Sequence, residues 1–297
     1  MRHVAALAAA LLLVTAACSD SKSNANATTT AVGATTTTAA GATTTTANPN
    51  KPKVTLPATL PTKLVITDLT TGTGPKAASG DTLIVNYVGV RSADGKEFDN
   101  SWDHQPFEVP LGSGNVIKGW DQGLIGVQEG GRRQLDVPAD LAYGSAPPDT
   151  TVIKPGDALS FVIDVVKLFP GSKTSEEPIV PIKAANNIAA ATYTELVPGS
   201  GPVIGGDQHV ALRLVLYRAD NGQKLTSTWG GPPVVFQLGA KSTTYPGFAA
   251  AATGMKVGGR RLAQIPYATV FDGKGNTNLK VPASIDIIAV VDLIGYY

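Results

Sequence analysis

The chain has 297 residues and nearly balanced charge, with 24 Lys and Arg against 23 Asp and Glu. Its length is enough for two ordinary domains, and a net charge of +1 excludes the strongly basic footprint of a dedicated nucleic-acid-binding protein. A single cysteine, Cys18, excludes an intrachain disulfide framework and a cysteine-based zinc site, and His3, His104 and His209 are too scattered to indicate a metal cluster. We therefore expect neither a metal nor an organic cofactor.

The first eighteen residues have the layout of an export signal. A basic start at Arg2 and His3 precedes an apolar run from Val4 to Ala17, which is too short for a membrane span. Because Cys18 directly follows this run, the segment resembles a bacterial lipoprotein signal, in which the cysteine is lipidated and becomes the new N-terminus. A plain secretory signal with an incidental cysteine is the alternative. Both predict an exported protein, and the first also predicts attachment to a membrane through lipid on Cys18.

A Thr/Ala-rich segment follows the signal. Between Ala27 and Thr46, eleven of twenty residues are Thr and six are Ala, so the segment has too few large apolar residues to build a core. We expect residues 19–60 to form a disordered tether. A Pro-rich linker is expected at residues 170–187, between folded segments at 61–169 and 188–297.

Two copies of one unit organise the rest of the chain, from Leu64 to Phe169 and from Thr192 to Tyr297. Leu111-Gly112 matches Leu238-Gly239 at an offset of 127, and Gly130-Gly-Arg-Arg133 matches Gly258-Gly-Arg-Arg261 at an offset of 128. One residue is therefore inserted between Gly239 and Gly247. With these offsets, equivalent positions of the two copies can be compared directly.

Each copy is predicted to contain mostly strands and one short helix. In the first copy, alternation over Thr82–Val90 places Leu83, Val85 and Tyr87 on one face, further strands are expected at 132–137 and 159–166, and a helical stripe covers 116–125. The second copy repeats the alternation at Val210, Leu212 and Leu214, with strands at 260–265 and 285–294 and a helix at 246–253. The predicted class is α+β, with an antiparallel sheet wrapped on one short helix, twice.

The first copy also carries an ordered set of short motifs. They are Tyr87-Val-Gly, Asp94-Gly-Lys-Glu-Phe-Asp99, Pro106-Phe107, Val116-Ile-Lys-Gly-Trp-Asp-Gln-Gly123, Gly130-Gly-Arg-Arg133, Val137-Pro138, Ala142-Tyr-Gly144 and Phe161-Val-Ile-Asp164. In their order and spacing these motifs resemble the FKBP-type peptidyl-prolyl cis-trans isomerases. The resemblance covers residues 64–169 and, with the duplication, implies two tandem FKBP-like domains.

The resemblance implies a pocket lined by aromatic side chains, with Trp120 at its floor. The other catalytic residues would be Tyr87, Phe98, Asp99, Tyr143 and Phe161, and the substrate-binding residues would be Phe107, Val116 and Ile117. Asp99 would lie at the rim, and the backbone N–H of Ile117 would bind a carbonyl of the ligand. Each aromatic residue taken alone is better explained as core, so the prediction depends on the ordered set.

Such a pocket suits isomerisation of an X-Pro peptide bond. Rotation about this bond crosses a barrier of about 18–20 kcal/mol, which arises from its partial double-bond character. The planar amide is more charge-separated than the twisted one, so an apolar site with little water favours the transition state over the ground state. The reaction needs no proton transfer and no covalent intermediate.

The second copy keeps none of the nine implied side chains. The replacements, in the order of the first copy, are Leu214, Leu225, Thr226, Val234, Thr244, Tyr245, Phe248, Phe271 and Ala289. By contrast, the glycines and prolines of the turns and the Gly-Gly-Arg-Arg motif are kept. We therefore predict a degenerate domain that holds the fold without the pocket.

The sequence thus predicts an exported peptidyl-prolyl isomerase that acts through its first domain and assists protein folding. Its predicted partners are proline-containing peptides and unfolded exported proteins, with rapamycin-like macrolides as inhibitors and no nucleic acid. The alternative comes from a different class. It is a non-catalytic surface protein, chaperone-like or structural, that binds clients with both domains.

Overall fold

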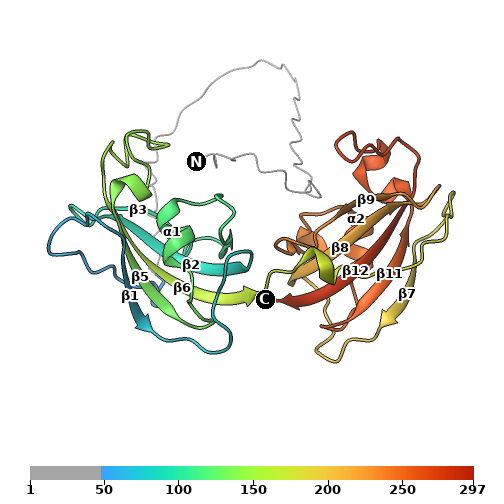
Figure 1. Ribbon diagram of the computed structural model, residues 1–297, viewed down its shortest axis with the longest axis horizontal. Helices are drawn as coiled ribbons and strands as arrows, with labels where there is room; N and C mark the ends of the chain where they lie inside the picture. The colour runs from blue at the N-terminus through green and yellow to red at the C-terminus, as the bar shows by residue number, and fades with distance from the viewer. Residues whose placement is uncertain (1–47) are drawn as a thin grey trace, which may run out of the picture.

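The computed structural model describes residues 48–297, which fold into two domains of the same design (Figure 1). In each domain a six-stranded sheet, antiparallel throughout its pairings, accompanies one short helix, as the sequence predicts. No helix among these residues is long and apolar enough to cross a membrane. The signal segment, Cys18 and the Thr/Ala-rich stretch from Ala27 to Thr46 lie outside the described residues.

The first domain builds its sheet around one long central strand pair. Its elements are β1 (Val65–Thr70), β2 (Thr82–Arg91), β3 (Glu97–Asn100), β4 (Phe107–Pro110), α1 (Lys118–Gly123), β5 (Arg132–Val137) and β6 (Leu159–Phe169). Strand β2 pairs with β6 on one side and with both β3 and β4 on the other, and β5 and β1 follow β6 outward. A 3₁₀ turn at Ala139–Leu141 follows β5.

The second domain repeats this order strand for strand. Its elements are β7 (Thr192–Val197), β8 (His209–Arg218), β9 (Lys224–Ser227), β10 (Val234–Gln237), α2 (Pro246–Ala252), β11 (Arg260–Ile265) and β12 (Ile287–Tyr296), with 3₁₀ turns at Gly239–Lys241, Tyr267–Thr269 and Phe271–Gly273. A further 3₁₀ turn at Thr174–Glu176 lies in the linker before this domain. Strand β8 pairs with β12, β9 and β10, and β11 and β7 complete the sheet. The shared topology agrees with an internal duplication.

Most predicted elements match in type and differ only at their ends. Strands β5 and β11 have the predicted bounds, whereas β6 continues to Phe169 and β12 continues to Tyr296. The helix predicted over 116–125 is shorter, since α1 covers only Lys118–Gly123. Ile117 has extended backbone angles (φ −59°, ψ 147°), and Gly126 has a positive φ of 80°, so the chain turns away at both ends.

The core of the first domain lies between the sheet and α1. Leu83 and Val85 are fully buried on the inner face of β2, as the alternation predicts, and Trp120 and Leu124 pack on them from the helix side. Gly119 allows this close approach, because a Cβ there would lie 2.4 Å from a methyl carbon of Val137. The tight packing fixes the position of Trp120.

The Gly-Gly-Arg-Arg motif connects the sheet to the end of the helix. Arg133 is buried, and its Nη1 donates to the carbonyls of Gly123 and Ile125 at 2.8 and 2.9 Å, while its Nε donates to Asp68 at 2.6 Å. The guanidinium also lowers the pKa of Asp68. A cation here satisfies helix carbonyls that have no partner within the helix. Arg261 makes the same bonds to the end of α2, so this motif belongs to the fold.

Residues 48–57, which we call the strap, lie along the outer face of the first sheet. Thr55 donates its backbone N–H to Oε1 of Gln134 at 3.2 Å, and the Gln134 amide donates back to the Thr55 carbonyl at 2.7 Å. Leu56 lies against Gly95. Side chains on the outer face of the sheet thus give specific partners to the strap, which belongs to the segment predicted as a tether through Leu60.

The two domains meet in a small apolar seam. Ile84, Phe169 and Ala211 are buried together, and the Phe169 and Tyr297 rings lie 6.4 Å apart between centroids. The ends of β6 and β12 meet at this point (Figure 1). By the internal offset Ile84 is equivalent to Ala211 and Phe169 to Tyr297, so equivalent positions of the two copies form the contact.

The linker after β6 is held on both sides. The N–H of Gly171 donates to Asp81 of the first domain at 2.7 Å. From the second domain, the buried Arg213 donates to the Pro170 carbonyl at 2.5 Å and to the Ser172 hydroxyl at 2.6 Å. These bonds fix the beginning of the predicted linker, which together with the seam joins the domains.

One acidic residue faces the seam. Glu108 pairs with Ile84 across β4 and β2, and burial raises its pKa to about 7. Its charge also contributes, after burial, to raising the pKa of Tyr297 to about 12. The second copy has Val235 at the equivalent position, which needs no proton to be buried.

We predict that Glu108→Gln removes a pH-dependent part of the stability. A glutamate whose pKa is raised from 4.5 holds its proton more tightly in the folded state, so stability falls as pH rises from 4.5 and levels off above about 7. The variant should lack this loss, which is on the order of 2 kcal/mol. Urea unfolding at pH 5 and pH 8 measures it. Equal pH dependence in both proteins would contradict the assignment.

Candidate functional site

Five aromatic side chains from five different elements meet on the inner side of the first sheet. We call Tyr87 (β2), Phe98 (β3), Phe107 (β4), Trp120 (α1) and Phe161 (β6) the aromatic cluster. All of them were predicted from the sequence as parts of one site. They lie far apart in the chain, and the sheet order brings them together because β3, β4 and β6 all pair with β2.

Trp120 is the centre of the aromatic cluster. Its ring centroid lies 5.2 Å from Tyr87, 5.3 Å from Phe161 and 6.2 Å from Phe107, each in an edge-to-face arrangement. Phe98 packs edge-to-face on Phe161 at 5.7 Å. Trp120 and Phe161 are each 4% exposed, whereas Phe107 is 40% exposed. The cluster therefore runs from a buried floor to a solvent-accessible edge.

A β-bulge lets two consecutive residues of β3 reach this site. Gly89 pairs with Asp99 and Val90 with Glu97, which leaves Phe98 as the extra residue. Gly89 is needed at this position, because a Cβ there would lie 2.8 Å from Phe98 and 2.9 Å from Phe161. The bulge and the glycine together set the two phenylalanine rings edge to face.

Asp99 lies at the exposed edge of the cluster, as predicted. Its Oδ2 accepts a hydrogen bond of 2.6 Å from the Tyr87 hydroxyl, and burial together with this bond raises the pKa of Tyr87 strongly. The pKa of Tyr143 is also raised, by burial and then by the charge of Asp99. Both phenols therefore stay protonated at neutral pH.

The start of α1 adds a polar group to this edge. Val116 and Ile117, the predicted substrate-binding residues, are half-buried and pack against the core that contains Trp120 and Phe161. Ile117 precedes the first helical residue, and within the described part of the chain its backbone N–H donates no hydrogen bond. Asp121, which sequence reasoning missed, accepts from the N–H groups of Gly112 and Gly114 at 2.9 and 3.0 Å and holds the preceding loop.

Sequence reasoning also missed Ser101, whose hydroxyl binds the backbone of Tyr87. Its hydroxyl accepts from the Tyr87 backbone N–H at 2.9 Å and donates to Asn86 at 3.1 Å, between the places where β3 and β4 pair with β2. In the second copy Thr228 accepts from Leu214 in the same way, at 2.9 Å. Both copies have a hydroxyl residue at this position, Ser101 and Thr228, and this shared residue type could have indicated the hydrogen bond from the sequence.

In one cross-strand pair, the small and the large residue have changed places between the two domains. In the first domain Gly89 pairs with Phe161 across β2 and β6, and in the second domain the equivalent pair across β8 and β12 is Leu216 and Ala289. Leu216 and Ala289 are both fully buried. The larger side chain has moved to the other strand, so the core stays filled while the ring beside the floor is lost.

In the second domain Phe271 packs on Phe248, the residue equivalent to Trp120. Its ring lies 5.9 Å from Phe248 and 5.4 Å from Tyr245, and it is 4% exposed, whereas the equivalent Tyr143 is 37% exposed. Three aromatic rings therefore form a closed core in the second domain. This packing has no exposed edge comparable to Phe107 and no acidic group in the place of Asp99.

Comparison with known proteins places both domains in one family. The family described as FKBP-type peptidyl-prolyl cis-trans isomerase matches residues 74–166 and, separately, residues 201–294, together more than half of the chain. The FK506-binding protein of Streptomyces anulatus is 48% identical over 118 residues, which cover 39% of this chain and 95% of that protein. The probable FK506-binding protein of Corynebacterium glutamicum is 42% identical over 118 residues, which cover 39% and 97%.

Solved structures of the same kind are also similar to this chain. FkpA from Escherichia coli shares 34% sequence identity with a TM-score of 0.33, over 41% of this chain and 54% of that chain. The sequence matches to both domains settle the assignment. The chain therefore belongs to the FKBP-type peptidyl-prolyl cis-trans isomerase family, with two such domains in tandem.

Proposed function

We propose that the first domain isomerises X-Pro bonds of exported proteins at the aromatic cluster, and that the second domain is a non-catalytic copy. The observation that supports this most directly is the convergence of the cluster on Trp120, with Asp99 at its exposed edge. The family assignment gives the type of reaction. The cluster and its closed counterpart in the second domain support the division of labour between the two domains.

The residues suggest how the reaction proceeds. The proline ring would pack on Trp120, which removes the imide from water, and the free N–H of Ile117 would donate to a substrate carbonyl. An apolar surrounding disfavours the charge-separated planar imide more than the twisted one, and thereby lowers the barrier. The hydrogen bond between the Tyr87 hydroxyl and Asp99 would keep the edge of the site polar and hold both side chains in a fixed orientation.

Macrolides are the proposed inhibitors of the same site. Relatives from Streptomyces anulatus and Corynebacterium glutamicum are named for binding FK506, and they share 48% and 42% identity with this chain over the matched residues. A ligand of this class would occupy the aromatic cluster and compete with the proline peptide. Competition by a rapamycin-like macrolide is therefore part of the proposal.

Asp99→Ala should lower kcat/KM for a proline tetrapeptide about tenfold, because a charge-assisted hydrogen bond at the edge of the site is lost. The assay uses the full chain and a protease-coupled or NMR readout of isomerisation. Thr226→Ala, at the equivalent position of the second domain, is the matched control and should leave the rate unchanged. Equal rates for wild type and Asp99→Ala would contradict the site, and a loss in Thr226→Ala would contradict the division of labour.

We also propose that the protein is exported and anchored to a membrane by lipid on Cys18. The basic start, the short apolar run and the cysteine that follows it support this proposal. In a bacterial host, Cys18→Ser should move the protein from the membrane fraction to the soluble extracytoplasmic fraction. A variant that stays in the membrane fraction would refute the lipid anchor.

A further inference from the structure

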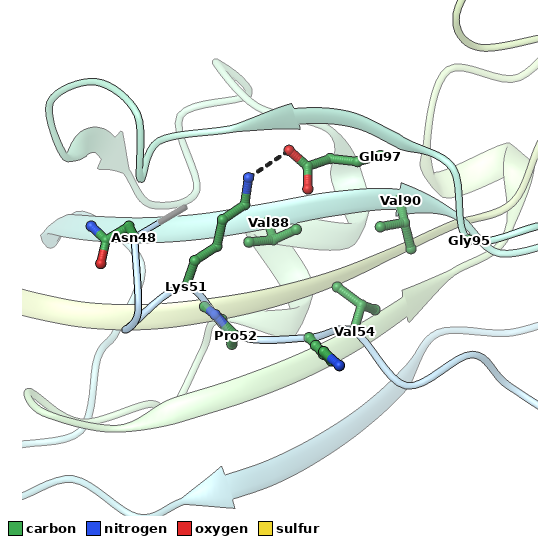
Figure 2. Close-up of a pocket in the computed structure, with 9 residues that line it drawn as sticks. Asn48, Lys51, Pro52, Val54, Val88, Val90, Gly95 and Glu97 are labelled. Carbon is green, nitrogen blue, oxygen red and sulfur yellow. Dashed lines mark hydrogen bonds and ion pairs between the residues drawn. The ribbon is translucent and has the colours of Figure 1, made fainter. Parts of the chain in front are cut away.

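The strap lies over the outer face of the strand that carries the site. It encloses a groove of about 380 Å³ with the sheet, in which Pro52 and Val54 face Val88 and Val90 (Figure 2). Lys51 extends from the strap across this groove to Glu97 on β3. The strap therefore contacts β3 from the side opposite to the aromatic cluster.

Lys51 binds two carboxylates at once. Its Nζ lies 2.8 Å from Glu97 and 3.6 Å from Asp103, and its side chain is only 21% exposed. The side-chain amide of Asn100 lies between the same carboxylates and donates to Glu97 at 2.9 Å and to Asp103 at 3.1 Å. The Lys51 ammonium group and the Asn100 amide thus connect Glu97, at the start of β3, with Asp103 in the loop that follows β3.

This network continues into the proposed active site. The backbone N–H of Asn100 donates to Oδ1 of Asp99 at 2.9 Å, and Oδ2 of Asp99 accepts from the Tyr87 hydroxyl. Both oxygens of the Asp99 carboxylate are thus oriented by neighbours. An unbroken series of hydrogen bonds runs from Lys51 through Glu97 and Asn100 to Asp99 and Tyr87.

The charges around Asn100 explain why a cation is needed. Glu97, Asp99 and Asp103 lie within seven residues of one another, and all three share Asn100 as a hydrogen-bond donor. Like charges at such distances repel each other. Lys51 compensates this repulsion, so its removal is expected to loosen β3 and the loop.

The second domain has the same attachment with the charges exchanged. Lys224 of β9, at the position equivalent to Glu97, pairs with Glu177 from the segment that precedes the second domain. The series of bonds ends there, because Thr226 and Leu214 replace Asp99 and Tyr87. The fold therefore tolerates this ion pair with the positive charge on either partner. In the second domain the pair is not connected to an aspartate or a tyrosine at the positions of Asp99 and Tyr87.

We propose that Lys51 is a positioning residue of the isomerase, which holds β3 so that Phe98 and Asp99 are ready to bind substrate. This inference rests on the proposed function of the first domain. A loose β3 reduces the fraction of molecules that can bind, and the apparent affinity falls by that fraction. Once substrate is bound the site is complete, so KM changes and kcat does not.

The test compares charge variants in the full chain. Lys51→Glu should raise KM for a proline tetrapeptide about fivefold at unchanged kcat, a size typical of a partly exposed ion pair. Lys51→Met, which keeps the apolar part of the side chain, should raise it about twofold. The double variant Lys51→Glu/Glu97→Lys, which copies the polarity of the second domain, should recover most of the loss in KM, because the ion pair re-forms although Asn100 loses its acceptor on Glu97. Glu177→Lys, which breaks the second attachment, should leave KM unchanged.

Hydrogen exchange tests the loosening of β3 directly, whereas the split between KM and kcat distinguishes positioning from a loss of folded protein. The amide of Asn100 should exchange about fivefold faster in Lys51→Glu and more slowly again in the double variant. The proposal is overturned if wild type is active and Lys51→Glu has the wild-type KM, or if the double variant does not recover. A lower kcat with unchanged KM also overturns the proposal, because it shows fewer folded molecules and no effect on substrate binding. An inactive wild type would refute the proposed function, and the role of Lys51 would fall with it.

Discussion

The aromatic cluster around Trp120 depends, on its Phe161 side, on one cross-strand pair, Gly89 and Phe161. Because glycine occupies β2 at this point, the Phe161 ring from β6 and the Phe98 ring from β3 can approach each other edge to face. A side chain at position 89 would displace both rings. The second domain shows the alternative solution, with Leu216 and Ala289 in the same register. This pair therefore contributes to the difference between the open aromatic cluster of the first domain and the closed core of the second.

Comparison of the two copies separates the residues of the fold from those of the site. The salt bridge of Arg132 with Asp164 and that of Arg260 with Asp292 are equivalent, with Nε to carboxylate distances of 2.5 and 2.7 Å. Arg133 and Arg261 hold the helix ends in the same manner. The copies differ where rings and Asp99 line the first site. The motifs that both copies share therefore stabilise the fold, and the residues of the proposed site are found only in the first copy.

Periodicity and motif order were enough to predict the strands β2, β5, β6, β8, β11 and β12, both helices and the convergence of the aromatic cluster. The short strands β3, β4, β9 and β10 and the edge strands β1 and β7 were not predicted. Periodicity and motif order were also not enough for the strap, the seam or the bonds of Lys51. Those features depend on single residues such as Gln134, Ile84 and Asn100, which meet partners far away in the chain and leave no periodic pattern. The length of α1 was overestimated for a related reason, because the apolar stripe includes Val116, Ile117 and Leu124, which lie just outside the two ends of the helix.

The seam has the arrangement expected of a symmetric dimer, in which the same patch is used twice. In a dimer of identical chains every substitution appears on both sides, so an acidic residue buried at the contact would face its own duplicate. A covalent tandem escapes this constraint. Glu108 is opposed by a domain that has Val235 instead, and the first domain keeps its aromatic cluster while the second closes around Tyr245, Phe248 and Phe271. Because the two copies are joined in one chain, equivalent positions on the two sides of the seam can carry different residues.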